Sequence, residues 1–226
     1  MQVLFKNNCL LCGARANGDF CGPCRDSLPH SPPHQCAVCA LPLAESRICG
    51  ACLAKPPAFD HTVAAMSYAF PVDALLHSLK YQANLAMASV LADLLTARID
   101  PDALPDFIVP MPLHPARLRE RGFNQALEIA QRVSRKSGVA LLPGICRRIK
   151  DTPSQTGLPW KEREKNIRNA FSCEADLGGK HVAMLDDVMT TGATLNELAK
   201  ALRKSGAAHV SGWVVARTLS SHDKIP

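Results

Sequence analysis

The stretch that decides the fold is Met184-Leu-Asp-Asp-Val-Met-Thr-Thr-Gly-Ala-Thr194. The residues from His181 onward are apolar and predict a buried strand that ends in two carboxylates, Asp186 and Asp187. A loop of small and hydroxyl residues follows, and a helix predicted over 194–204 begins directly after it. Ligand sites in parallel α/β sheets lie where the strands end, so this stretch predicts a binding site.

Each part of the stretch suits a sugar phosphate. A loop that opens a helix presents free backbone N–H groups and the positive end of the helix to a phosphate. The two carboxylates accept hydrogen bonds from sugar hydroxyls and can ligate Mg²⁺. The residues predicted to bind the phosphate are Thr190, Thr191, Gly192, Ala193 and Thr194. The alternative is a capping box between Thr194 and Glu197, with the two acids as ordinary turn residues.

Working outward from this stretch, strand and helix patterns alternate along the chain. Predicted strands cover 63–70, 107–112, 140–146, 181–186 and 209–216, and predicted helices cover 72–81, 85–97, 125–137 and 194–204. This alternation predicts an α/β fold with a mostly parallel sheet. The proline-rich segment Lys55–Asp60 marks a domain boundary, which divides the chain into residues 1–57 and 58–226.

Residues 1–57 contain eight of the ten cysteines, arranged as four Cys-x-x-Cys pairs. Two such pairs supply the four sulfurs of a tetrahedral Zn²⁺ site, so four pairs predict two metal ions. The predicted ligands are Cys9, Cys12, Cys21, Cys24, Cys36, Cys39, Cys49 and Cys52. All-thiolate sites leave no open position for a catalytic water, so we expect the zinc to have a structural role.

The cysteine pattern also repeats, with an offset of 27 or 28 residues between corresponding cysteines. A repeat favours two sequential zinc ribbons, one over Cys9–Cys24 and one over Cys36–Cys52. A cross-braced arrangement, in which alternate pairs share an ion, stays open. The remaining cysteines, Cys146 and Cys173, are interpreted as single, with Cys146 as a small buried hydrophobe.

The net charge of +6 is concentrated in one segment of the 226-residue chain. From His114 to Arg168 there are 13 Lys and Arg residues against 5 Asp and Glu residues. Such a segment suits a small polyanion or a nucleic-acid backbone, although most charge runs are simply solvated surface. No apolar stretch approaches the length of a membrane span, and residues 1–12 lack a signal-peptide pattern, so we expect a cytoplasmic protein.

Three motifs carry a family resemblance. LDDVMTTGAT at 185–194 resembles the phosphoribosyl-pyrophosphate signature of type I phosphoribosyltransferases. VPMPLHPARLRERGFNQA at 109–126 and TPSQTGLPWKEREKNIRNAF at 152–171, together with the cysteine pairs, are similar to the ComF family. The resemblance implies a type I phosphoribosyltransferase-like parallel sheet flanked by helices and preceded by a double zinc ribbon.

The resemblance also implies roles for named residues. Asp186 and Asp187 would hold the ribose hydroxyls of phosphoribosyl pyrophosphate, which binds with Mg²⁺, and Thr190–Thr194 would bind its 5′-phosphate. A pyrophosphate cradle and a mobile hood would come from the basic segment. The cradle residues are Pro112, Leu113, His114, Arg117, Arg119, Arg121 and Asn124, and the hood residues are Lys150, Gln155 and Arg163. The sequence indicates no catalytic residue in the strict sense.

Three functions remain open at this point. The first is transfer of a phosphoribosyl group to an unknown acceptor. The second is a module that binds single-stranded DNA and keeps the phosphoribosyltransferase fold without catalysing a reaction, since the family is linked to DNA uptake in competent bacteria. The same link implies a possible protein partner in DNA uptake. The third is a scaffold held together by structural zinc.

Overall fold

The computed structural model describes residues 7–45, 47–150 and 167–218, and at its centre lie two long strands, β8 (His181–Met189) and β9 (His209–Arg217). Both strands are apolar on both faces and almost wholly buried, which is typical of a parallel sheet covered on two sides. The sheet order is β3-β9-β8-β4-β5 and every pair in it is parallel. The other strands are β3 (His61–Ser67), β4 (Phe107–Pro110) and β5 (Ala140–Leu141). The predicted parallel α/β fold is confirmed.

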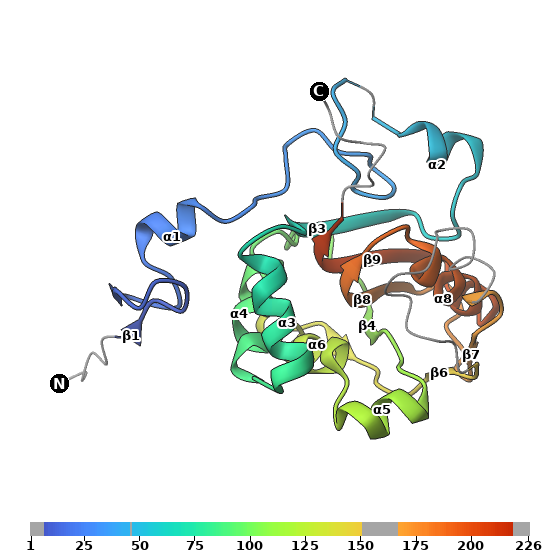
Figure 1. Cartoon of the computed structure of the whole chain (residues 1–226). Coiled ribbons are helices and arrows are strands. Elements are labelled where there is room, and N and C mark those ends of the chain that lie inside the picture. The colour runs from blue at the N-terminus through green and yellow to red at the C-terminus, as the bar shows by residue number, and fades with distance from the viewer. Residues whose placement is uncertain (1–6, 46, 151–166, 219–226) are drawn as a thin grey trace.

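Helices cover both faces of this sheet (Figure 1). On one face, α4 (Ala86–Thr96) packs against β3 and β9, and α6 (Gln125–Ser137) packs against β4 and β8. α3 (Val72–Gln82) packs on α4, and α8 (Ala193–Lys204) covers β8 and β9 from the other side. The short α5 (Pro115–Arg121) lies beyond the end of β4. No helix in the described part of the chain is long and apolar enough to cross a bilayer.

One predicted strand is wrong. The segment 140–146 is not a single strand, because Pro143 and Gly144, with φ +84°, interrupt it. Its first part is β5 at the sheet edge, and its end begins β6 (Cys146–Arg148), which pairs antiparallel with β7 (Phe171–Cys173) in a separate two-stranded sheet. The predicted helix 125–137, by contrast, has the predicted bounds and ends at Gly138 in the left-handed region.

The interpretation of Cys146 and Cys173 as single is also wrong. The two residues lie directly opposite each other in the β6–β7 pair and form a disulfide. They are 27 residues apart in the chain, and only the antiparallel pairing brings them together. The disulfide therefore closes the chain segment on which the hood residues were predicted.

The cysteine-rich part comprises β1 (Asn7–Asn8), β2 (Arg15–Ala16), α1 (Gly22–Asp26) and α2 (Gly50–Ala54). Figure 1 shows β1 and α1 projecting away from the sheet, whereas the chain that leads to α2 passes over the end where β3 and β9 terminate. Backbone contacts join the connecting chain to that end of β3: Ser67 donates to the Pro29 carbonyl at 2.8 Å, and His30 bridges to Met66.

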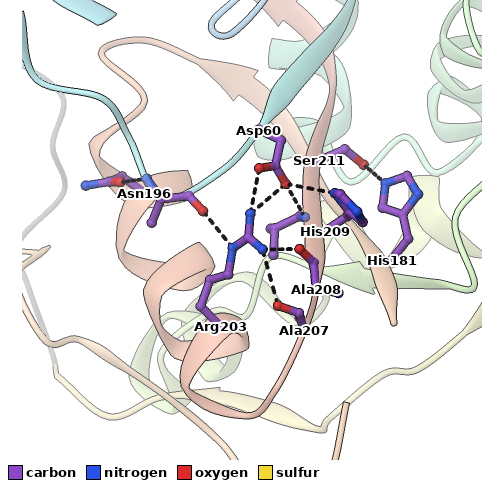
Figure 2. Close-up of polar contacts among 10 residues, drawn as sticks. Asp60, His181, Asn196, Arg203, Ala207, Ala208, His209 and Ser211 are labelled. Atoms are coloured by element: carbon purple, nitrogen blue, oxygen red, sulfur yellow. Dashed lines mark hydrogen bonds and ion pairs between the residues drawn. The ribbon is translucent and has the colours of Figure 1, made fainter. Parts of the chain in front are cut away.

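At the other end of β3, where this strand begins, a polar clamp attaches it to α8 (Figure 2). Arg203 donates to both carboxylate oxygens of Asp60, at 2.6 and 2.7 Å. The same carboxylate accepts from the Val210 N–H at 2.7 Å, and the Ala58 N–H donates to Asn196 Oδ1 at 2.7 Å. Both bonds come from Nη2, while Nε donates to the Ala58 carbonyl and Nη1 to those of Ala207 and Ala208, so the guanidinium is held on all sides. The clamp therefore positions β3 relative to the helix that follows the predicted phosphate loop.

Candidate functional site

A cavity of about 630 Å³ opens at the carboxyl ends of β4 and β8. Its walls come mainly from α3, the β4–α6 region, the end of β8 and the start of α8, and Tyr68, Arg148 and Thr218 contribute from other parts of the chain. Among its polar lining residues are Lys80, Arg117, Arg121, Gln125, Asp186, Asp187, Thr190 and Thr194. The cavity thus brings the predicted acid pair and phosphate loop together with two of the predicted cradle arginines.

The acid pair lies inside β8 and is more buried than the sequence suggested. Asp186 and Asp187 are 8% and 4% exposed, because β8 continues to Met189 instead of ending at the acids. Asp187 forms an ion pair with Lys80 of α3 and accepts from Gln125 Nε2 at 3.5 Å. Burial alone raises the pKa of a carboxyl group, but Lys80 outweighs it and holds the pKa of Asp187 below its usual value.

Asp186 has the opposite shift. Burial, and next the charge of Asp187, raise the pKa of Asp186 well above its usual value. The ammonium of Lys80 therefore stabilises the charged form of Asp187, whereas Asp186 favours the protonated form. Strongly divergent pKa values of adjacent carboxyl groups in a cavity are typical of functional sites. Such a pair combines an acceptor with a donor, which suits recognition of neighbouring sugar hydroxyls.

The loop after β8 has the geometry that a phosphate cradle needs. Gly192 has φ +78°, and a Cβ at this position would lie 2.6 Å from Met189 Cε, so both backbone conformation and packing demand glycine. α8 begins at Ala193, one residue earlier than predicted, and no side chain caps its start. The Ala193 N–H donates to Thr191 Oγ1 at 3.3 Å, while Thr190 and Thr194 line the cavity.

The capping-box alternative is wrong. Gly192, not Thr194, is the N-cap residue, and it offers no side chain. Glu197 accepts instead from the backbone N–H of Asn169 at 2.7 Å and from Lys200 Nζ at 2.5 Å. Since the N-cap residue Gly192 offers no side chain, the first-turn N–H groups of α8 that follow Ala193 remain suited to an anion.

Arg117 and Arg121 form a basic wall of the cavity that also contains the acid pair. Arg121 donates to Gln125 Oε1 at 2.5 Å, and its guanidinium lies 5.8 Å from the centre of the Tyr81 ring. Arg117 pairs with Glu120 at 2.7 Å on the same helix, in an exposed position that holds it weakly. Arg121, Gln125 and Asp187 are joined by hydrogen bonds, so the basic wall and the acid pair belong to one network.

The remaining predicted residues lie in different places. Asn124 is the N-cap of α6, accepting from Ala126 and Leu127, and His114 is the N-cap of α5, accepting from Ala116. Leu113 lines the main cavity and also, with Pro112, His114 and Asn124, a neighbouring cavity of about 460 Å³. Arg119 is exposed and lines neither cavity, and Lys150 donates to the Arg168 carbonyl at 2.7 Å. Gln155 and Arg163 lie outside the described residues.

Both cysteine groups have the geometry of a tetrahedral metal site. The sulfurs of Cys9, Cys12, Cys21 and Cys24 lie within 4.8 Å of one another, and so do those of Cys36, Cys39, Cys49 and Cys52. Cys12 and Cys21 are 3.6 Å apart at sulfur, and Cys39 and Cys49 are 3.7 Å apart. Zn–S bonds in tetrahedral geometry separate sulfurs by about 3.8 Å. The sequential arrangement is therefore confirmed over the cross-braced one, and the donor set fits Zn²⁺.

Comparison with known proteins agrees with the zinc-ribbon assignment of the cysteine-rich part and identifies the family. The family model described as double zinc ribbon domain matches residues 1–53. Competence protein F of Haemophilus influenzae is 34% identical over 230 residues, which cover 96% of this chain and 100% of the relative. The chain belongs to the ComF family. DNA utilization protein YhgH of Escherichia coli K12 is a further relative, 38% identical over 81% of this chain and 84% of its own length.

Solved structures similar to this ComF chain include a glutamine phosphoribosylpyrophosphate amidotransferase from B. subtilis, complexed with ADP and GMP. The TM-score is 0.38 with 21% sequence identity, over 56% of this chain and 25% of that longer chain.

Sequence reasoning missed the contribution of α3 to the site. Lys80 and Tyr81 line the cavity, and nothing in the sequence around them distinguishes them from surface residues at the end of a helix. The structure places Lys80 directly after the buried Leu79, on the edge of the apolar face of α3. Gln125 lies in the Arg-Gly-Phe-Asn-Gln turn of the ComF-like motif, and the structure assigns it to the network around Asp187.

Proposed function

We propose that this ComF protein binds phosphoribosyl pyrophosphate in the cavity and transfers its phosphoribosyl group to an acceptor. The observation that supports the proposal is the arrangement around one cavity of a buried acid pair, an uncapped helix start preceded by a left-handed glycine, and a facing pair of arginines. These features suit a ribose diol, a 5′-phosphate and a pyrophosphate, in that order.

The residues would divide the work by charge. Asp186 and Asp187 would hold the two ribose hydroxyls, and the N–H groups of the loop before α8 would bind the 5′-phosphate. Mg²⁺, which oxygen-rich sites of this kind accept, would neutralise part of the diphosphate charge. Arg117 and Arg121 would stabilise the pyrophosphate as the acceptor's nucleophile attacks C1 and the C1–O bond breaks toward the leaving group. Positioning and charge stabilisation then account for catalysis without a general base.

Calorimetric titration with phosphoribosyl pyrophosphate in the presence of Mg²⁺ tests this proposal. We expect wild-type protein to bind, and the Asp186→Asn/Asp187→Asn double variant to lose binding at least about tenfold, since the charged acceptor at Asp187 and the carboxyl group of Asp186 both disappear. Arg119→Ala is the control, because Arg119 is exposed and lies outside the cavity, so its loss removes a charge without touching the site. Failure of the wild type to bind would overturn the proposal.

A second candidate is binding of single-stranded DNA, which the names of the relatives favour: one is a competence protein and the other a DNA utilization protein. The guanidinium of Arg121 lies 5.8 Å from the centre of the Tyr81 ring, which is 63% exposed, and Arg117 lines the same cavity. Basic side chains next to aromatic rings suit a single strand. A protein partner in DNA uptake would fit the same role. Because eight cysteines form two metal groups and, among the described residues, only Cys146 and Cys173 form a disulfide, we propose a reducing compartment, the cytoplasm.

Salt-dependent binding to a labelled single strand distinguishes the two candidates. If the basic wall contacts DNA, Arg117→Ala/Arg119→Ala/Arg121→Ala should lower affinity and reduce the slope of log affinity against log salt by up to about two, roughly 0.7 for each lost phosphate contact. An unchanged affinity and slope would exclude this face as the DNA contact.

A further inference from the structure

Arg217, the last residue of β9, connects the second cysteine group to the phosphate loop. Its Nε donates to the carbonyl of Cys39 at 3.0 Å. Its Nη1 donates to the carbonyls of Met189, at 3.4 Å, and of Thr190 and Thr218. One guanidinium therefore holds a metal-binding turn at one end and, at the other, the two residues that lead into the loop before α8.

The burial of Arg217 requires an explanation. The residue is 7% exposed, and within the described ranges no carboxylate lies in ion-pair contact with it. Burying an uncompensated guanidinium is unfavourable by several kcal/mol. A zinc ion with four thiolates carries a net charge of −2, and the second group lies directly beside Arg217 through Cys39. A loaded metal group would therefore supply a counter-charge to Arg217, in addition to the four backbone carbonyls that accept from it.

The contacts of Arg217 also determine how the loop is presented. The Met189 carbonyl accepts from both Arg217 and the N–H of Thr218, and the Thr190 carbonyl accepts from Arg217. With these carbonyls held on the side of Arg217, the peptide units that lead to Gly192 have one orientation. Met189 also packs where a Cβ of Gly192 would lie, so backbone and side chain restrict the same turn.

The first cysteine group lacks any such connection among the described residues. Within the described part of the chain, no hydrogen bond or ion pair of Cys9, Cys12, Cys21 or Cys24 reaches the sheet or the loop. Figure 1 shows this part of the chain projecting away from the sheet. The two groups repeat in sequence but differ in what they contact.

We infer that Arg217 is a positioning residue, through which metal binding at Cys36, Cys39, Cys49 and Cys52 orders the phosphate loop, while metal at the first group does not act on the site. The effect on ligand affinity rests on the proposed function, whereas the effect on loop order does not. The consequence is a ComF site whose ligand binding depends on one of its two zinc ions.

The cysteine repeat provides a matched pair of variants. Cys24 and Cys52 are each the third residue of a short helix, α1 and α2, and each is partly buried. Cys24→Ser and Cys52→Ser should each remove about one zinc per chain, measured by metal analysis of the full-length protein. Amide hydrogen exchange of residues 189–195 then reports loop order, and calorimetry with phosphoribosyl pyrophosphate and Mg²⁺ reports affinity.

We expect Cys52→Ser to speed exchange in the loop and to weaken binding by about tenfold or more, and Cys24→Ser to leave both within about twofold of wild type. Arg217→Met should keep both zinc ions yet reproduce the Cys52→Ser effect on the loop. Arg217→Lys should fall between them, because lysine keeps the charge but not the fork of donors. Combining Arg217→Met with Cys52→Ser should add little beyond either change.

Equal effects of Cys24→Ser and Cys52→Ser, or wild-type exchange in Arg217→Met with its zinc intact, would overturn the inference. If Cys52→Ser does not fold, Arg217→Met and Arg217→Lys carry the test. If wild-type protein does not bind phosphoribosyl pyrophosphate, the proposed function fails, but the exchange data still decide whether the second metal group orders the loop.

Discussion

The pairing of Lys80 with Asp187 is the residue-level feature on which the site depends most. Burial alone would lower the pKa of Lys80, but Asp187 outweighs it and raises the pKa, so both groups stay charged inside the cavity. A charged pair in this position contributes stability only while both partners are present. Lys80 comes from α3, so the pair also fixes that helix against β8.

Replacing Lys80 by methionine should therefore destabilise the protein by about 3 kcal/mol at pH 7, the cost of leaving one buried charge unpaired. The folded-state pKa of Asp187 lies below its unfolded value, so the contribution is present above about pH 4 and is lost as the pH falls through the folded-state pKa. Urea unfolding at pH 7 and pH 3 should show the difference between wild type and variant shrinking in acid.

Lys136→Met is the control for that measurement, because Lys136 pairs with Asp93 at 2.7 Å but both side chains are 45% exposed. It should cost less than about 1 kcal/mol at either pH. A Lys80→Met variant as stable as the control would contradict a role for the buried pair.

Gly192→Ala is expected to lower the free energy of unfolding for two reasons. The left-handed φ alone costs about 1 kcal/mol for alanine, and the Cβ must also displace Met189 Cε. Gly138→Ala isolates the first penalty, because Gly138 has φ +76° and open space around it. Chemical denaturation should find Gly192→Ala the less stable of the two, and binding of phosphoribosyl pyrophosphate should weaken only in Gly192→Ala.

At the scale of elements, Glu197 shows how α8 is fixed to the start of β7. Its carboxylate accepts from the N–H of Asn169, which has φ +53°, and from Lys200. Burial raises the pKa of Glu197, but the hydrogen bonds from Lys200 and the Asn169 N–H outweigh it, so the pKa is lowered overall. The contact therefore stabilises the protein above the unfolded pKa.

Glu197→Gln should cost about 1–2 kcal/mol at pH 7, because the amide accepts more weakly than the carboxylate from both donors. The loss should diminish below about pH 4, as the wild-type carboxyl also becomes protonated. Thermal unfolding across this pH range measures it. Glu174→Gln serves as the comparison, since Glu174 pairs with Arg147 at 3.8 Å on the exposed surface and should change stability by under about 0.5 kcal/mol.

Elements with a strong period and clear ends could be predicted, and those that depend on partners could not. Gln125–Ser137 has an apolar face, an Asn N-cap and a Gly C-cap, so local physics determines both ends. β8 extends past its acids because β9 beside it runs equally far and continues the ladder, which the polar sequence Asp186-Asp187 alone does not indicate. β6 exists only because β7 pairs with it.

For the whole molecule, the two metal groups should differ in how readily they release zinc. Of the first group only Cys9 is buried, whereas Cys36, Cys39 and Cys49 of the second are buried. A chelating dye should therefore remove one equivalent of zinc quickly, from the first group, and the second equivalent slowly, because the chelator must reach the thiolates. Cys24→Ser should lack the fast phase and Cys52→Ser the slow one; the opposite assignment would show that exposure does not control release.

The sequence alone determined the chemistry and its order along the chain: two four-cysteine groups, a parallel sheet, and the acid pair followed by a loop and helix. These depend on residues within one turn, one pair or one strand, so local spacing is enough. Only the tertiary structure decided which partners these residues have. Lys80 reaches Asp187, Arg217 joins Cys39 to Thr190, and Cys146 meets Cys173 because strand order and helix packing bring distant segments together. Those contacts join residues between 27 and 178 positions apart in the chain, and no local pattern specifies them.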